Sequence, residues 1–343
     1  MRFVLVAWLL SRAVIVAALC VASPHPLAAA GNWDGAWYGS IAQHGYNFAT
    51  RGSQRDAAFF PLYPMLASLL LRVGIGWPLA GVLVNNVAFF AALCVIYVMA
   101  RERWDAGTAR WCVAVACALP PSLFASVAYR EGTFLCFSAL ALWWTLRGAR
   151  FAGGLAGAAA SATSAIGIAL AAALVIDAVV MRRGARAVAC AALAFGGVTL
   201  FALFCALRFG DPLAFIHAQH GWRASGIDTG AWLRVLASLG TWQGFRQNSM
   251  VIVLVPIATI AMLVQYKWLG LLLGTYGLLT MAIILFAGEP ISVDRFAYAT
   301  IPVLIALGRA LQRVPIAGGG LLLASLALLA YDTVQFARFH WVA

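Results

Sequence analysis

The chain has 343 residues, of which 64% are hydrophobic and only 10% are charged, and its mean hydropathy is +0.92. This composition excludes an ordinary soluble domain, in which about a quarter of the residues carry a charge. The net charge of +12 comes from basic residues spread along the chain, which indicates the positive-inside bias of a membrane protein and argues against nucleic-acid binding. The seven cysteines form no CxxC pair, so they predict neither a disulfide framework nor a metal knuckle.

Apolar segments of about 18 to 22 residues, the length of a membrane-spanning helix, recur along the whole chain. They predict an all-α, multi-pass membrane protein, a helical bundle with about 9–11 transmembrane segments. The first segment is long and has no clear cleavage site, which favours an uncleaved span over a signal peptide. With the arginine clusters on the cytoplasmic side, the spans cover residues 3–22, 79–100, 109–128, 132–148, 187–207, 249–266, 268–287, 296–312 and 315–335.

The first outer loop, residues 23–78, contains the most distinctive run of the chain, WDGAWY at residues 33–38. Asp34 is an acid among amphipathic aromatics beside a membrane span. One interpretation makes it a general base, or a group that organises a cation or a phosphate. The other makes it an acid that the helix dipole favours at a helix N-terminus. The position of Asp34 in the sequence does not decide between these two interpretations.

A helix over about residues 33–44 would place Trp33, Trp37 and Ile41 on one face. We expect this aromatic stripe to anchor the helix in lipid. Asp34 would then turn towards protein or water.

Two segments do not fit simple spans. Residues 57–73 are short and contain Pro61 and Pro64, which indicates an interfacial or half-inserted helix on the outer face. Residues 152–181 have basic clusters on both sides, so they are expected to enter and leave on one face as two short helices that meet at 161–167. Such broken helices occur where the unwound backbone lines a cavity or is buried in protein. A single long tilted span is the alternative.

Other polar residues are expected on the outer side. Glu131 follows Arg130 at the end of a span, where the two are either part of a site or an ordinary interfacial pair. Arg295 begins a span from the outside, against the positive-inside bias, which favours a phosphate-binding role. His217 and His220 are spaced so that they could share a metal, although loop histidines are more often plain polar residues.

These residues also carry a family resemblance. The run WDxxWYxxIAxxGY at 33–46, followed by FFPLYP at 59–64, resembles the PIG-V family of mannosyltransferases. That family includes the enzyme that adds the second mannose in GPI-anchor synthesis, together with bacterial relatives. AYRE at 128–131, FGDPLAF at 209–215 and Arg295-Phe296 resemble the bacterial branch.

The resemblance implies a GT-C glycosyltransferase fold whose first outer loop carries the catalytic acid. Such enzymes use a polyprenyl- or dolichyl-phosphate sugar and invert the anomeric carbon. By motif, Asp34 would be the catalytic residue, and Glu131 would stand where the family's Tyr-Ser-Glu has its acid. The chain departs from the pattern at Arg130, where Ser is expected, and at Ser164, where relatives often have Arg. This could be an exchange across one cavity that keeps a positive charge for the lipid phosphate.

Sugar transfer from a lipid phosphate needs a base, cations for the departing phosphate and a dry pocket. Asp34 fits the base, a groove beside 161–167 fits the polyprenyl chain, and Arg130, Arg295 and Arg223 fit the phosphate. Sugar-stacking or interfacial roles are predicted for five aromatics, for which a lipid-belt role is the alternative: Trp33, Trp37, Tyr38, Tyr46 and Tyr63.

The predicted function is transfer of a sugar, mannose by the resemblance, from a polyprenyl-phosphate donor to a glycan or lipid acceptor. We expect one domain over residues 1–343, with outer loops at 23–78 and 208–248, in the inner membrane of a bacterium with the site facing the exterior. Membrane lipids are expected partners and nucleic acid is not. No cofactor is predicted, and a divalent metal is left open. The alternatives are a GT-C enzyme for another sugar or aminosugar, and a transporter or flippase for a lipid-linked sugar.

Overall fold

The computed structural model describes residues 1–47, 50–51, 54–221, 230–286 and 292–342. Its first part contains α1 (Arg2–Ala22), α2 (Pro26–Ala29), α3 (Asp34–His44), β1 (Thr50–Arg51), β2 (Gln54–Arg55), η1 (Asp56–Ala58), α4 (Leu62–Arg72) and α5 (Leu79–Arg103). Its middle part contains α6 (Ala106–Ala118), η2 (Pro120–Ala125), α7 (Glu131–Leu146), α8 (Arg150–Ser161), α9 (Gly167–Val180), α10 (Ala185–Ala192), η3 (Leu193–Phe195) and α11 (Gly196–Phe209). Its last part contains α12 (Ala214–His217), η4 (Ala218–Gly221), α13 (Ala231–Ser238), α14 (Trp242–Leu269), α15 (Leu271–Phe286), α16 (Val293–Tyr298), α17 (Ile301–Gln312) and α18 (Pro315–Ala337).

The protein is an all-helical, multi-pass membrane protein, as the hydropathy predicts. Within the described residues, β1 and β2 form one short antiparallel pair, and everything else that is regular is helical. In the described part of the chain, five helical stretches are long and apolar enough to cross a membrane: α1, α5, the run from α10 to α11, residues Val251–Leu269 of α14, and α18. Shorter apolar helices include α4, α6, α9, α15 and α17.

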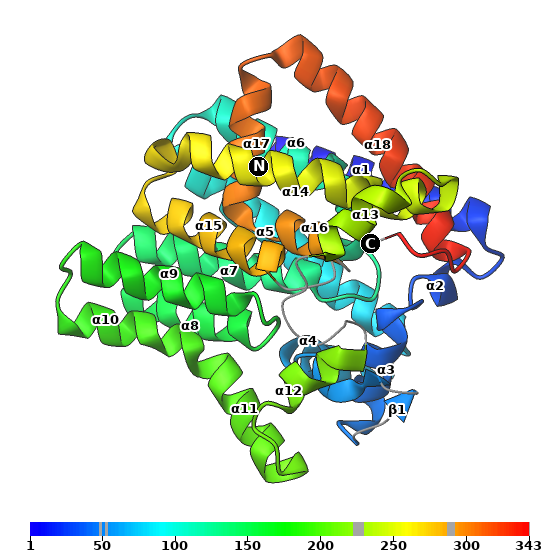
Figure 1. Cartoon of the computed structure of the whole chain (residues 1–343), viewed down its shortest axis with the longest axis horizontal. Coiled ribbons are helices and arrows are strands. Elements are labelled where there is room, and N and C mark those ends of the chain that lie inside the picture. Colours follow the sequence, from blue (N-terminus) through cyan, green and yellow to red (C-terminus); the bar gives the residue numbers. More distant parts are fainter. Residues whose placement is uncertain (48–49, 52–53, 222–229, 287–291, 343) are drawn as a thin grey trace.

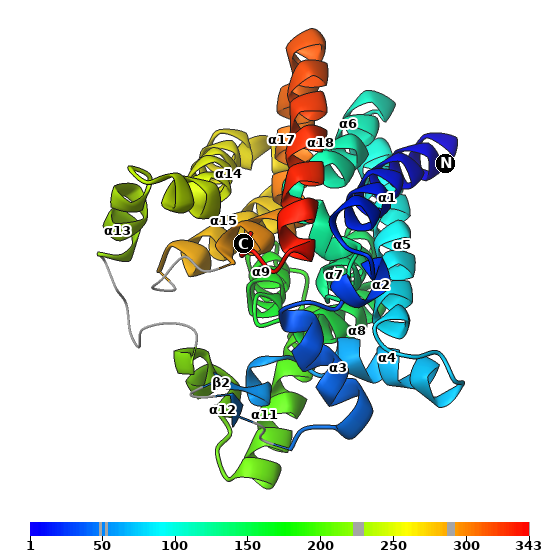
Figure 2. The same cartoon turned by 90° about the vertical axis from the view of Figure 1, so that its right-hand side faces the viewer.

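The helices form two regions with the candidate site between them. In both Figure 1 and Figure 2, α3, α4, α12 and the strands gather at one end of the molecule, and α17 and α18 extend towards the other. The largest hydrophobic core lies among α5, α6, α7, α9, α14, α15 and α17, and a second core joins α3, α4 and η1 to α11 and α12. Glycines permit close packing in the large core: a Cβ on Gly308 of α17 would lie 2.7 Å from the backbone nitrogen of Cys112 in α6.

The segment 152–181 is the broken helix pair that the charge pattern predicts. α8 ends at Ser161 and α9 begins at Gly167, and the connection between them contains Ser164, which is buried. The backbone N–H of Leu62, at the start of α4, donates a hydrogen bond of 3.0 Å to the carbonyl of Ala162. This bond ties the expected interfacial helix to the helix break.

Two predicted spans are wrong as continuous helices. The span 109–128 ends as an α-helix at Ala118, because Pro120 and Pro121 follow it and the chain continues as the 3₁₀ helix η2. The span 296–312 is divided between α16 and α17, with Pro302 in the first turn of α17. The short helices at these breaks, η2 and α16, contact each other through Phe124 and Arg295.

The expectation that an aromatic stripe of α3 lies in lipid is also wrong. Trp37 and Ile41 are 5% and 7% exposed, and the indole of Trp37 stacks on Phe59 with ring centroids 5.6 Å apart. The chain after the strands folds back over this face of α3. These side chains do share one face of the helix, as their spacing predicts. That face is covered by other parts of the protein and not by lipid.

Candidate active site

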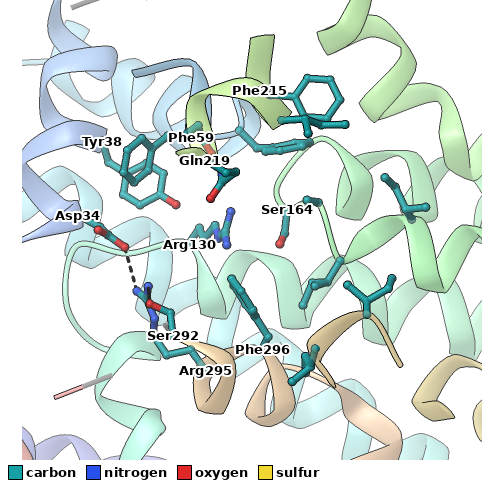
Figure 3. A pocket seen from close by; sticks show the side chains of 18 of the residues that line it. Asp34, Tyr38, Phe59, Arg130, Ser164, Phe215, Gln219, Ser292, Arg295 and Phe296 are labelled. Carbon is teal, nitrogen blue, oxygen red and sulfur yellow. Dashed lines mark hydrogen bonds and ion pairs between the residues drawn. The ribbon is translucent and has the colours of Figure 1, made fainter. Parts of the chain in front are cut away.

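A cavity of about 310 Å³ lies where α3, the break between α8 and α9, α12, α15 and α16 converge. One part of its wall is polar and carries Asp34, Arg130, Ser292 and Arg295 (Figure 3). Another part is apolar and carries Ile166, Ile168, Ile283, Ile284 and Phe296. The cavity therefore offers a charged end beside a surface that suits a hydrocarbon chain.

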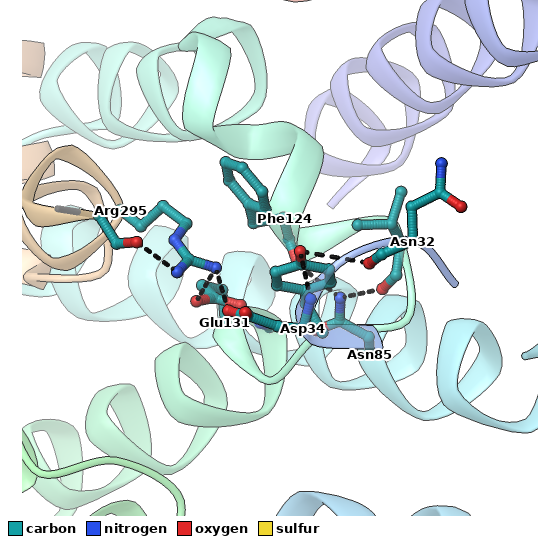
Figure 4. Close-up of polar contacts among 10 residues, drawn as sticks. Asn32, Asp34, Asn85, Phe124, Glu131 and Arg295 are labelled. Carbon is teal, nitrogen blue, oxygen red and sulfur yellow. Dashed lines mark hydrogen bonds and ion pairs between the residues drawn. The ribbon is translucent and has the colours of Figure 1, made fainter. Parts of the chain in front are cut away.

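The polar end is built around a guanidinium between two carboxylates. Nη1 of Arg295 donates to Oδ2 of Asp34 at 3.0 Å and lies 3.9 Å from Oε1 of Glu131 (Figure 4). The side chains of Arg295 and Glu131 are 7% and 4% exposed, and that of Asp34 is 17% exposed. Burial opposes the charge on Arg295, but the nearby carboxylates outweigh it and raise its pKa. The cation is therefore fixed in its charged form.

Asp34 is the first residue of α3, where the helix dipole favours a negative charge. Its backbone N–H donates to the hydroxyl of Tyr129 at 3.1 Å. Gly35 follows it and packs against the carbonyl of Ala128, which a Cβ would approach to 3.5 Å. The start of α3 is thus held against the loop that precedes Arg130.

Glu131 is the first residue of α7, and Asn85 of α5 fixes this helix end. The side chain of Asn85 accepts a hydrogen bond of 2.7 Å from the N–H of Gly132, and donates to the carbonyls of Phe124 and Val127. One amide therefore joins α5, η2 and the start of α7. Oε2 of Glu131 is buried and has no hydrogen-bond partner among the described residues.

Two aromatic rings and a serine contact the guanidinium of Arg295. Its guanidinium lies 4.8 Å from the ring centroid of Phe124 and 5.3 Å from that of Tyr129, and Nη2 donates to Ser292 at 2.6 Å. Phe124 lies on η2, which the buried Arg12 of α1 anchors through the carbonyls of residues 122 and 125. An arginine inside the first apolar segment is thus a structural support of the site.

Arg130 and Ser164 lie on the same cavity (Figure 3). The guanidinium of Arg130 is 5.6 Å from the ring centroid of Phe296. Among the described residues it makes no ion pair, in contrast to Arg295. A compensating exchange between positions 130 and 164 requires that both lie on one cavity. Arg130 and Ser164 meet this requirement.

Of the five predicted aromatics, Tyr38 lines the cavity. Trp33 packs against Phe339 and Trp341, with ring centroids 5.5 and 5.2 Å apart. The remaining three belong to the packing around α3 and α4 and do not line the cavity: Trp37, Tyr46 and Tyr63.

Two other predicted groups fall elsewhere. Arg223 lies outside the described residues. Nδ1 of His217 is 2.7 Å from Asp211, and the rings of His217 and His220 are 6.2 Å apart. In the described part of the chain no three His, Cys, Asp or Glu side chains are grouped as metal ligands.

Reasoning from the sequence missed Asn85, Phe124 and Arg12. Polar and charged residues inside apolar segments are costly unless they are paired. Arg12 in the first span and Asn85 in the second therefore carried a signal that could have found them. Phe124 carried none, because a phenylalanine beside prolines is an ordinary apolar residue.

This architecture resembles that of the GT-C membrane glycosyltransferases. No family model and no curated protein matches the sequence.

Two solved structures share the fold. One is ArnT from Cupriavidus metallidurans bound to undecaprenyl phosphate, with a TM-score of 0.60 and 18% identity over 96% of this chain and 64% of that one. The other is the oligosaccharyltransferase of Archaeoglobus fulgidus in the apo form, with a TM-score of 0.57 and 11% identity over 99% of this chain and 56% of that one. The chain thus spans less than two thirds of each.

Proposed function

We propose that this chain is a membrane-embedded GT-C glycosyltransferase that moves a sugar from a polyprenyl phosphate to a hydroxyl group. The observation that carries the proposal is the cavity that joins Asp34, Arg130 and Arg295 to an apolar wall at a helix break. A carboxylate, two guanidiniums and a hydrocarbon-lined surface are the groups that this reaction needs. The shared fold with an ArnT that bound undecaprenyl phosphate supports the same class of donor here.

In the proposed reaction, Asp34 accepts the proton of the acceptor hydroxyl as that oxygen attacks the anomeric carbon. The bond between this carbon and the phosphate oxygen breaks, and the polyprenyl phosphate leaves with its electron pair. Attack opposite the leaving group inverts the anomeric carbon. A cation must stabilise the charge on the departing phosphate, and the enclosed cavity limits attack by water.

Of the three arginines that sequence analysis assigned to the phosphate, the two within the described residues have different surroundings. Arg295 is already paired with Asp34 at 3.0 Å and is buried against Glu131, so we assign it to positioning the base. Arg130 lines the cavity without an ion pair among the described residues, so we assign it to the phosphate of the donor. Glu131 acts through Arg295 by holding the guanidinium in place.

The finer parts of the proposal rest on the sequence. They are mannose as the sugar, a glycan or lipid acceptor, one domain over residues 1–343 with outer loops at 23–78 and 208–248, and a bacterial inner membrane with the site facing outwards. Of the five aromatics predicted from the sequence, Tyr38 is the one that lines the cavity, and we assign it to stacking on the sugar. No cofactor is required by this scheme, and a divalent metal is left to experiment. An enzyme for another sugar remains the alternative, supported by Arg130 and Ser164 in the pocket.

The test supplies purified protein with polyprenyl-phosphate-mannose and candidate acceptors, and with polyprenyl phosphates that carry other sugars. We expect transfer by the wild type and a loss of about 100- to 10,000-fold in Asp34→Asn, the range for removal of a general base. Glu102→Gln is the matched acid control, because Glu102 is exposed and pairs with Arg147 away from the cavity. If the protein scrambles the lipid-linked sugar across the membrane without transferring it, the protein is a flippase and the proposed enzymatic function is wrong.

A further inference from the structure

A second polar cleft lies far from the candidate active site, where α5, α14 and α17 end and α6 begins. It has a volume of about 430 Å³ and is lined by Trp104, Asp105, Thr108, Trp268, Arg309, Gln312 and Arg313. α5 has the length of a membrane span, with Asn85 at the active-site end and Trp104 just beyond the other end. The cleft and the site therefore belong to opposite faces of the membrane. Figure 1 shows the α17–α18 turn at the opposite end of the molecule from α3 and α4.

The cleft contains a stack of indoles and guanidiniums. The rings of Trp104 and Trp268 stack with centroids 4.2 Å apart and an interplanar angle of 19°. The guanidinium of Arg309 lies 3.6 Å from the centroid of Trp268, and that of Arg103 lies 5.4 Å from the centroid of Trp104. An arginine held by its flat face on an indole keeps its N–H groups at the edge free for a ligand.

The positive charge of the cleft is not balanced by protein. Arg309 and Arg313 are four residues apart on α17, so they are neighbours on one face, where like charges repel. Within the described residues neither makes a hydrogen bond or an ion pair through its side chain. The carboxylate in the cleft, Asp105, accepts hydrogen bonds from Thr108 and Gln312 instead. The two guanidiniums that line the cleft, Arg309 and Arg313, and its one carboxylate leave an excess positive charge.

The surroundings of the cleft indicate a lipid as the occupant. Val264, on α14 just before Trp268, is 76% exposed, and Ile316, at the start of α18, is 93% exposed. Apolar side chains exposed to this degree on a membrane protein face hydrocarbon. Tryptophans and arginines at the ends of spans lie at the level of the lipid head groups. A head-group phosphate could therefore enter the cleft while its acyl chains lie along α14 and α18.

We propose that this cleft binds the phosphate head group of an anionic phospholipid, with Arg309 and Arg313 as its ligands and the Trp104–Trp268 stack as the support of Arg309. The site is independent of sugar transfer and of the residues assigned to it. It fits a basic pocket between membrane helices, a kind of site that takes anionic lipids. The ammonium of Lys267, next to Trp268 in sequence, adds to the positive charge of this end of α14.

The experiment measures binding of phosphatidylglycerol to the purified full chain by native mass spectrometry and by the thermal shift that the lipid produces. We expect phosphatidylglycerol to bind and to raise the unfolding temperature, and phosphatidylcholine to do neither. Arg309→Gln and Arg313→Gln are each expected to weaken binding about tenfold, the loss of one charge-assisted hydrogen bond. Trp268→Leu is expected to weaken binding while it leaves both charges in place.

Arg186→Gln is the matched control, because Arg186 is an exposed basic residue on α10, away from the cleft. It should bind phosphatidylglycerol as the wild type does. Equal weakening in Arg186→Gln, or unchanged binding in both cleft arginine variants, would overturn the proposal. Inorganic phosphate is a separate arm: if it alone stabilises the wild type as much as the lipid does, and Arg309→Gln abolishes that effect, the ligand is a free phosphate and the lipid assignment is wrong.

Discussion

The pairing of Arg295 with two acids predicts a specific stability effect. Nη1 of Arg295 is 3.0 Å from Asp34 and 3.9 Å from Glu131. With an effective dielectric constant of about 20, these distances correspond to attractions of about 5.5 and about 4 kcal/mol between full charges, and the second attraction is smaller because burial raises the pKa of the Glu131 carboxyl. Desolvation of the charges offsets much of this gain, so the net contribution of the cluster is far smaller. Removal of the cation alone nevertheless leaves two acids without their counter-charge, one of them in a fully buried position.

We therefore expect Arg295→Met to lower the free energy of unfolding by about 3–5 kcal/mol. Adding Glu131→Gln to this variant should recover part of the loss, because it removes the buried charge that Arg295→Met leaves unpaired. The coupling between the two substitutions is expected to be about 1–3 kcal/mol.

The assay is reversible unfolding in mixed micelles of the wild type, the two single variants and the double variant. Arg186→Met, at an exposed position, controls for the general effect of losing an arginine. If the two substitutions add to within about 0.5 kcal/mol, the carboxylate of Glu131 does not depend on Arg295. The interpretation that Asp34 and Glu131 share the guanidinium of Arg295 would then be wrong.

Three further predictions concern the same region. A Cβ at Gly132 would lie 2.3 Å from a backbone oxygen of α5, so Gly132→Ala should cost about 1–3 kcal/mol of unfolding free energy, whereas Gly319→Ala, with nothing within 4 Å, should not destabilise. Burial raises the pKa of the Asp294 carboxyl to about 6, so the folded state keeps this proton longer than the unfolded chain does. The free energy of unfolding should therefore fall by roughly 1–3 kcal/mol as the pH rises from about 4 to above 6. Asp294→Asn should remove that part of the fall, and an unchanged pH profile in this variant would contradict the prediction. Arg130→Ser should weaken donor binding about tenfold or more, measured by titration with polyprenyl phosphate. Adding Ser164→Arg to this variant should restore part of the binding. If binding does not recover, the exchange of charge across the cavity is contradicted.

Much of the helical architecture was predictable from hydropathy and charge. Long apolar runs need helical backbone in a membrane, since every N–H and carbonyl must be paired within the segment. The same reasoning found the break between α8 and α9, because basic clusters on both sides of 152–181 require the chain to return. Two predicted spans are interrupted inside apolar runs: α6 ends just before Pro120, and Pro302 lies in the first turn of α17, after α16 has ended.

The candidate site was predictable only in part. Asp34 was a candidate because acids beside spans are uncommon, and Arg130 was one because it departs from the family pattern at that position. The face of α3 was misassigned, because a stripe such as Trp37 and Ile41 looks the same whether lipid or another segment covers it. The different surroundings of Arg130 and Arg295 were also hidden, since sequence shows charge and not distance.

The sequence by itself determined that this chain is a helical membrane protein, that segment 152–181 is a broken helix pair and which acids and arginines are candidates for chemistry, because each of these follows from local composition and spacing. Tertiary structure alone decided that Arg295 meets Asp34 across 261 positions of sequence and that Arg130 lies on the same cavity without an ion pair among the described residues. The physical reason is that the energy of a buried charge depends on the few ångströms around it. Those neighbours come from helices that are distant in the chain.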